Sequence, residues 1–112
     1  MKIVFDEVDA GYEECEVRLM EEVVTSVRST LERAGISGAL LRGLVSEIAF
    51  DVGAIVDGSA SMSIDDDYLV PILGFAQGRM RDRLLLASAG GGSSLHEFVP
   101  GIVEDEFAKS SD

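Results

Sequence analysis

The residues best suited to chemistry lie just after an apolar stretch, where Asp57, Ser59 and Ser61 alternate with small residues. One carboxylate and two hydroxyls are hard oxygen ligands of the kind that bind Mg²⁺ and Ca²⁺. Three more carboxylates follow a few residues later: Asp65, Asp66 and Asp67. They lack the spacing of an EF-hand loop, and adjacent acids are usually a solvated run of charge. Residues 57–67 therefore predict either a metal site or a polar loop that follows a helix.

The spacing Asp57-x-Ser59-x-Ser61, within residues 54–62, resembles the metal-ion-dependent adhesion site of von Willebrand factor A domains. The resemblance implies a bound Mg²⁺ with these three side chains among its ligands. In that family the motif follows the first strand of a parallel sheet and leads into a helix. Here helical periodicity precedes the motif, and a polar loop and a strand containing Pro71 follow it. We therefore do not assign the chain to that family.

A second candidate site is the glycine-rich stretch that leads into the last predicted helix: Gly90, Gly91, Gly92, Ser93 and Ser94. Backbone amides at such a corner can bind an anionic ligand, aided by the helix dipole. However, the stretch has neither a P-loop lysine nor a G-x-G-x-x-G pattern, and Glu97 would repel an anion. Ser94 and Glu97 also match a capping box, in which each side chain binds a free amide at the helix start. A flexible connector before a self-capped helix is the alternative interpretation.

No group of residues in the sequence predicts a catalytic centre. His96 is the only histidine and could act as a general base for Ser93 or Ser94 if a carboxylate oriented it. The sequence does not place those partners together. Cys15 lies among three glutamates, whose negative field disfavours the reactive thiolate. We therefore favour a protein without enzymatic activity.

The basic residues cluster at one place, where Arg79, Arg81 and Arg83 follow a predicted hairpin turn. Alternate residues of an extended strand share a face, so these three could bind a carboxylate or an acidic segment together. The alternative is a solvated hairpin end, or one paired with the acids at 65–67.

The charge of the chain restricts its partners. Among 112 residues, 21 are acidic and 9 are basic, for a net charge of −12. Nucleic acids are polyanions, so we expect no nucleic-acid binding. An acidic surface favours association with a basic protein partner, although the same charge can serve only to keep the chain in solution.

The apolar segments and the cysteine content predict where the protein acts. No apolar run approaches the roughly 18 residues of a membrane span, so we expect no membrane partner. The N-terminus lacks the apolar core of a secretory signal, and the single cysteine excludes an internal disulfide. These features predict a cytoplasmic protein, and nothing in the sequence predicts a cofactor.

Two long helical segments are expected to position the candidate residues. Apolar spacings of three and four predict helices over about 13–34 and 37–57, linked closely enough to form an antiparallel helical hairpin. Gly35 and Gly58 follow these helices as residues suited to a left-handed C-terminal turn. The second helix is expected to pack through one apolar face: Leu41, Leu44, Val45, Ile48, Val52, Ile55 and Val56.

The second half of the chain predicts a β-hairpin and a final helix. Strands are expected over about 68–76 and 82–88, followed by an amphipathic helix over about 94–108. The first strand is almost continuously apolar, which predicts cover on both faces, although Pro71 favours an edge position or a bulge. The chain is thus expected to form one α+β domain over 1–112.

The predicted β-hairpin is too small to be stable alone. Either residues 2–6 add a third strand, or a second copy pairs with an unpaired edge. We expect a homodimer, and a non-enzymatic binding or regulatory protein that acts through protein–protein contacts. The alternative function is binding of a metal or an anionic ligand by the 57–67 loop or the 90–94 glycine loop.

Overall fold

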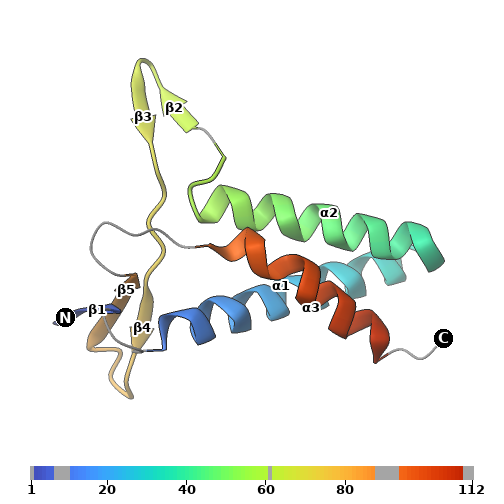
Figure 1. Ribbon diagram of the computed structural model, residues 1–112, viewed down its shortest axis with the longest axis horizontal. Coiled ribbons are helices and arrows are strands. Elements are labelled where there is room, and N and C mark those ends of the chain that lie inside the picture. Colours follow the sequence, from blue (N-terminus) through green and yellow to red (C-terminus); the bar gives the residue numbers. More distant parts are fainter. Residues whose placement is uncertain (1, 7–10, 61, 88–93, 110–112) are drawn as a thin grey trace.

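The chain folds into three packed helices, with a small mixed sheet at one end of them (Figure 1). The structure is a computed structural model, and it describes residues 2–6, 11–60, 62–87 and 94–109. The helices are α1 (Tyr12–Arg33), α2 (Gly38–Val56) and α3 (Leu95–Ala108). The strands are β1 (Lys2–Asp6), β2 (Met62–Ile64), β3 (Asp67–Leu69), β4 (Phe75–Gln77) and β5 (Arg83–Ala87). The predicted α+β class, with a C-terminal helix and an N-terminal strand, is confirmed.

The helical hairpin forms where the sequence predicts it. α1 ends at Arg33 with Ala34 as its C-cap, and Gly35 then takes a φ of 85°, the left-handed conformation that only glycine adopts without strain. Ser37 is the N-cap of α2, so the link between the helices is very short and they run antiparallel (Figure 1). Gly58 follows α2 with a φ of 83°.

The core lies where one face of each helix meets the other two. α2 packs against both α1 and α3, and the buried apolar residues recur every four positions along each helix. The cluster consists of Met20, Val24, Leu41, Val45, Ala49, Leu95, Val99 and Val103. This four-residue period places one side chain per helical turn in the contact.

The predicted core face of α2 is only partly correct. Leu41 and Val45 are buried, but Ile48 and Ile55 are exposed. The buried positions in the second half of the helix are instead Ala49 and Gly53. Small residues there let α3 approach closely, because a Cβ at position 53 would lie 3.0 Å from the backbone nitrogen of His96. The contact between α2 and α3 therefore follows residue size as well as hydrophobicity.

A three-stranded sheet has the order β1-β5-β4, with β1 parallel and β4 antiparallel to β5. β1 thus supplies the third strand that the hairpin needs. The predicted strand over 68–76 is wrong in its extent, because it is divided between β3 and β4. Pro71 lies between the two parts and has no N–H for a sheet ladder. The predicted cover on both faces is also wrong, since Tyr68 and Ile72 are more than 80% exposed.

The two faces of this sheet differ in their surroundings. Val4, Leu85 and Phe75 are paired across the strands and face α1, where the rings of Phe75 and Tyr12 meet edge to face at 5.4 Å. The opposite side, here called the outer sheet face, carries Ile3, Phe5, Leu84 and Leu86. Ile3 and Phe5 remain 56% and 46% exposed.

β2 and β3 pair with each other as a hairpin that projects away from the helices (Figure 1). Residues 62–64 were expected in a polar loop but form β2 instead. Residues 62–72 are called the arm, because this hairpin and the residues that follow it stand outside the main body. No helix in the described part of the chain is long and apolar enough to cross a membrane.

The close approach of α3 to Gly53 makes a testable prediction about stability. Alanine favours a helix over glycine by about 1 kcal/mol at either Gly43 or Gly53. At Gly53 the added Cβ meets the backbone of α3, so we expect Gly53→Ala to lower the free energy of unfolding by about 1–3 kcal/mol. At Gly43 the same change meets nothing within 4 Å and should be neutral or stabilising. Urea unfolding followed by circular dichroism measures both, and equal effects would contradict the close packing.

Candidate functional site

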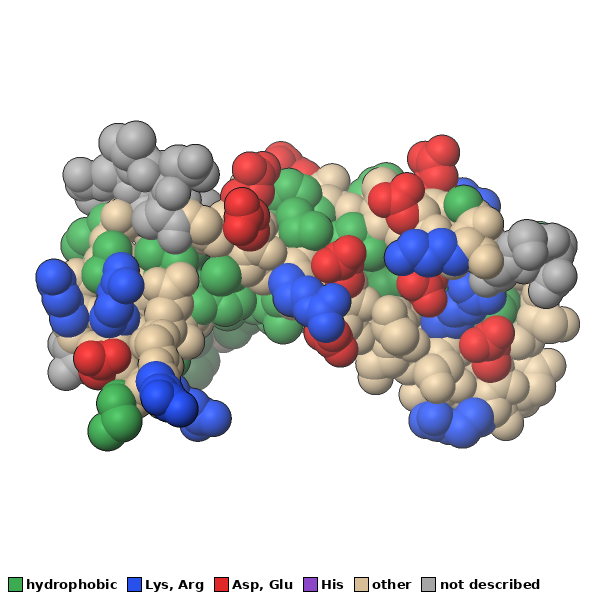
Figure 2. All heavy atoms as spheres, turned by 90° about the horizontal axis from the view of Figure 1, so that it is seen from below, with side chains coloured by type: hydrophobic (Ala, Val, Ile, Leu, Met, Phe, Trp, Pro, Cys, Tyr) green, Lys and Arg blue, Asp and Glu red, His purple; other side chains and the backbone are tan. Residues whose placement is uncertain are grey.

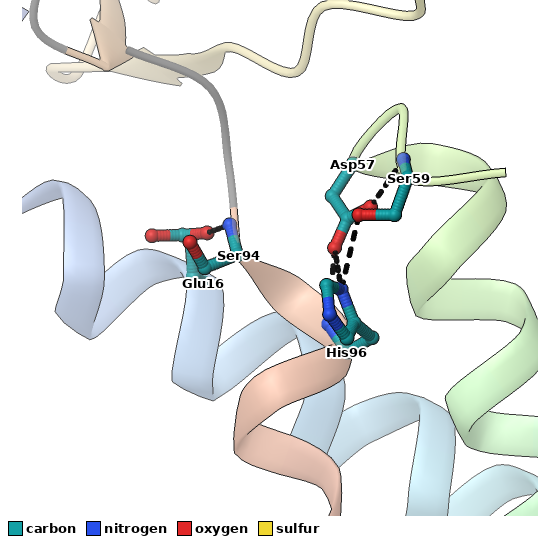
Figure 3. A network of polar contacts seen from close by, with 5 residues as sticks. All are labelled: Glu16, Asp57, Ser59, Ser94 and His96. Carbon is teal, nitrogen blue, oxygen red and sulfur yellow. Dashed lines mark hydrogen bonds and ion pairs between the residues drawn. The ribbon is translucent and has the colours of Figure 1, made fainter.

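Asp57, the C-cap of α2, makes polar contacts with both Ser59 and His96, and its side chain is 0% exposed. Its Oδ1 accepts a hydrogen bond from the backbone N–H of Ser59 at 2.9 Å. Its Oδ2 accepts the backbone N–H of His96 at 3.2 Å and lies 2.5 Å from Nδ1 of the same residue (Figure 3). Asp57 thus joins the end of α2, the turn after it and the first turn of α3.

A second buried carboxylate binds the start of the same helix. Glu16 comes from α1, is almost fully buried, and accepts the backbone N–H of Ser94 through Oε2 at 2.7 Å (Figure 3). A helix N-terminus carries free N–H groups and the positive end of the helix dipole, so carboxylates are favourable there. We call Glu16, Asp57, Ser59, Ser94 and His96 the carboxylate junction.

The predicted capping box at Ser94 and Glu97 does not form. Ser94 is the N-cap of α3, but its side chain makes no capping hydrogen bond. In a capping box the N-cap amide would bind Glu97, and here it binds Glu16 instead. The amides at the start of α3 are therefore bound by Glu16 and Asp57, and not by the local side chains that the sequence predicts.

The surroundings of Asp57 keep it ionised. Burial by itself acts to raise its pKa. Hydrogen bonds from the His96 ring, the Ser59 hydroxyl and the amides of both residues outweigh burial and hold the pKa of Asp57 below its ordinary value of 3.8. The junction therefore contains a buried negative charge that is fully hydrogen-bonded. No buried side-chain nitrogen or oxygen in the described residues lacks a partner.

Asp57, Ser59 and His96 have the residue types of a hydrolase triad but not its geometry. In a triad the carboxylate and the serine bind different ring nitrogens of the histidine. Here Ser59 Oγ lies 3.3 Å from Nδ1, the same nitrogen that Asp57 contacts. The ring also rests edge-on against Phe50, with centroids 5.2 Å apart. The arrangement fixes His96 in place and does not activate Ser59.

The residues predicted to hold a metal lie in two separate places. Asp57 is buried in the junction, and both of its oxygens accept hydrogen bonds within the protein. Asp65, Asp66 and Asp67 are exposed at the tip of the arm. Ser61 lies outside the described residues. Across the described ranges, no three His, Cys, Asp or Glu side chains come close enough to hold a metal ion.

The predicted anion site can be followed only at its last residue. Gly90, Gly91, Gly92 and Ser93 lie outside the described residues. Ser94 begins α3, and its amide is taken by Glu16. The negative charge at this helix start is thus supplied by the protein itself.

The three arginines lie beside the turn between β4 and β5. Only Arg83 is in a strand, and Arg81 has a φ of 53°, so the predicted alternation along one strand face does not hold. All three are exposed, and Lys2 lies next to Arg83 in the sheet. We call Lys2, Arg79, Arg81 and Arg83 the basic end. Within the parts of the chain that the structure describes, no ion pair joins them to Asp65, Asp66 or Asp67.

The view from below shows how charge is distributed over one face of the molecule. In Figure 2, several Lys and Arg side chains lie over the sheet, at the left of the view, and others lie in the middle and at the right, among acidic side chains. Positive charge is therefore present at the end that carries β1, β4 and β5 but is not confined to it.

The arm exposes an unusual amount of apolar surface. Met62, Ile64 and Leu69 share one of its faces, because Met62 pairs with Leu69 and side chains two residues apart point the same way. Asp67, which pairs with Ile64, ends this face at the tip. Exposure reaches 63% for Ile64 and 86% for Tyr68, and Val70 and Ile72 are exposed beyond them. Contiguous exposed apolar patches mark interaction sites. This surface was not expected from the sequence, although apolar and polar residues alternate over Met62-Ser63-Ile64 before an acidic turn.

The comparisons with known proteins identify no relative. No protein-family model matches the chain, and no similar curated protein or solved structure was found. The function is therefore argued from geometry alone.

The carboxylate junction makes a prediction about pH. Because the pKa of Asp57 is lowered by folding, its ionised form stabilises the protein above pH 3.8, and this stabilisation is lost as the pH falls toward the lower pKa of the folded state. We expect Asp57→Asn to cost about 2 kcal/mol at neutral pH. The difference from the parent protein should shrink as the pH falls below 3.8.

The matched control is Asp51→Asn, which changes an exposed carboxylate on the same helix. It should alter stability by no more than about 0.5 kcal/mol at any pH. Urea unfolding between about pH 7 and pH 3 compares the two variants. A loss for Asp57→Asn that stays constant through this range would show that shape, not charge, matters at the junction.

Proposed function

We propose that this protein acts by binding another protein chain and that it works as a homodimer. The observation that carries the proposal is the arm, which places large apolar side chains in solvent outside the packed body. Such a protein would be a binding or regulatory subunit and not an enzyme. Apolar side chains on the arm and the outer sheet face would be stabilised if a partner buried them.

The arm is too small to be stable by itself. β2 and β3 have three residues each, and a two-stranded hairpin of this size is marginal in water without further packing. Its strands pair with each other and make few contacts with other elements of the described chain. Burying a side chain such as Ile64 or Leu69 is worth about 1.5–3 kcal/mol, so a partner that covers the arm would stabilise it substantially.

The outer sheet face also leaves apolar side chains in contact with water. A sheet with one face in water normally alternates apolar residues inside with polar residues outside. Here the outer positions are apolar as well, and Ile3 and Phe5 stand largely open. Leu84 and Leu86 are covered in part, with their methyl groups close to Gly74. Both surfaces lie at the same end of the molecule (Figure 1).

The experiment measures the dimer and the contribution of the arm to it. Sedimentation equilibrium of the parent protein should give a dimer at micromolar concentration. Replacing Ile64 and Leu69 with serine removes two apolar contacts, each worth more than about 1 kcal/mol, and should weaken dimerisation more than about tenfold.

The control replaces two exposed apolar residues elsewhere, Leu40 and Ile55 on α2, with serine. This variant loses comparable apolar surface but should keep the dimer. A parent protein that stays monomeric would refute the homodimer. A dimer lost only in the α2 variant would move the interface from the arm to α2.

A further inference from the structure

We infer that the two copies exchange arms, so that each arm lies on the outer sheet face of the other copy with its acidic tip at the basic end. This inference rests on the proposed homodimer and specifies how the copies meet. Three observations support it: the directions in which the arm and the sheet project, the apolar character of both surfaces, and their opposite charges.

The first observation is geometric. The arm and the β4–β5 turn lie at the end of the molecule away from the C-terminus, and they project in opposite directions (Figure 1). A twofold axis close to the line of view in Figure 1 would reverse these directions in the second copy. The second copy's arm would then run beside the sheet of the first, and the reciprocal contact would form at the same time. Such a contact is closed and self-complementary, as in most homodimers.

The second observation is the match of apolar surfaces. The arm presents Met62, Ile64 and Leu69 on one face, over strands that span about 10 Å. The outer sheet face presents Ile3 and Phe5 on β1, and Leu84 and Leu86 on β5. Ile3 pairs with Leu84, and Phe5 pairs with Leu86. The apolar patch therefore consists of two neighbouring pairs of side chains across β1 and β5. On each surface, exposed apolar side chains remain that the other surface would cover, Ile64 on the arm and Ile3 and Phe5 on the sheet.

The third observation is the position of the charges. The tip of the arm carries Asp65, Asp66 and Asp67, all exposed. The basic end lies where β1 and β5 begin, with the backbone N–H of Lys2 bound to the carbonyl of Asp82 at 2.8 Å. Asp82 lies between Arg81 and Arg83 in the sequence, and the four cations of the basic end outnumber this acid. Arginine pairs well with carboxylates, and the tip of a partner arm would supply them.

The net charge of −12 makes two copies repel each other, so a dimer needs a contact where opposite charges meet. An acidic tip against a basic end gives two attractive contacts in a symmetric dimer. Within the described part of one chain, the acids at the tip of the arm form no ion pair with the arginines of the basic end.

A charge exchange between two variants tests the contact. One variant carries Asp66→Lys and Asp67→Lys at the tip, and the other carries Arg79→Glu and Arg83→Glu at the basic end. Asp65 and Arg81 are left unchanged because both have a positive φ. The control reverses two exposed acids on α3, Glu104→Lys and Asp105→Lys, which changes the net charge as much as the tip variant does.

Each variant alone places like charges together, and we expect it to dimerise at least about a hundredfold more weakly than the parent protein. The α3 control should stay within about threefold of the parent. An equal mixture of the two variants restores opposite charges at both contacts, so it should form a heterodimer of near-parental affinity. Sedimentation equilibrium measures the affinities, and native mass spectrometry identifies the mixed mass.

The outcomes separate this inference from the proposed function. Variants that dimerise like the parent, or a mixture that fails to restore the heterodimer, would overturn the arm exchange and leave the homodimer standing. A parent protein that is monomeric under all conditions would overturn both. Recovery in the mixture also shows that neither variant is misfolded.

Discussion

The fold depends on two buried carboxylates that bind the start of one helix. The first amides of α3 have no partner inside that helix, and leaving them buried without one would cost about 1–3 kcal/mol each. Glu16 of α1 and Asp57 at the end of α2 accept two of them. Because Glu16 comes from α1 and Asp57 lies at the end of α2, the start of α3 has both hydrogen bonds only where all three helices pack together. Burying carboxyl groups costs free energy unless they are hydrogen-bonded, and no buried side-chain oxygen in the described residues lacks a partner.

The same junction fixes the base of the arm. Asp57 ends α2, and Gly58 turns the chain with a φ of 83°. A Cβ at Gly58 would lie 2.7 Å from a methyl carbon of Val70, so the chain that returns from the arm passes directly over this turn. The two ends of the arm are therefore held together at the junction, while its strands extend beyond the body. A firm base with an unsupported hairpin is a suitable design for a segment that contacts another chain.

Local patterns in the sequence were sufficient to predict the helices and the fold class, but they did not predict which residues of different elements are in contact. The helix boundaries follow from apolar spacing and from Gly35 and Gly58, which act within a few residues. The partner of Ser94 is Glu16, 78 residues away, and no local rule connects them. The sequence suggests Asp57 and Ser59 together, in one motif with Ser61, and His96 separately, as candidates for chemistry. The structure brings the three together, yet their shared contact at Nδ1 makes them a structural cap.

Buried polar groups and exposed apolar side chains together indicate which part of the molecule contacts a partner. Polar groups in the described interior have their partners, so the junction offers a ligand little that is not already bound. Exposed apolar side chains are instead concentrated on the arm and the outer sheet face. Scattered exposed apolar residues are normal in a soluble protein and need no explanation. A projecting hairpin whose apolar face matches an open sheet of the same chain is different, because each surface lacks the cover that the other can supply in a second copy. Interaction with another chain is therefore the function that this arrangement best supports.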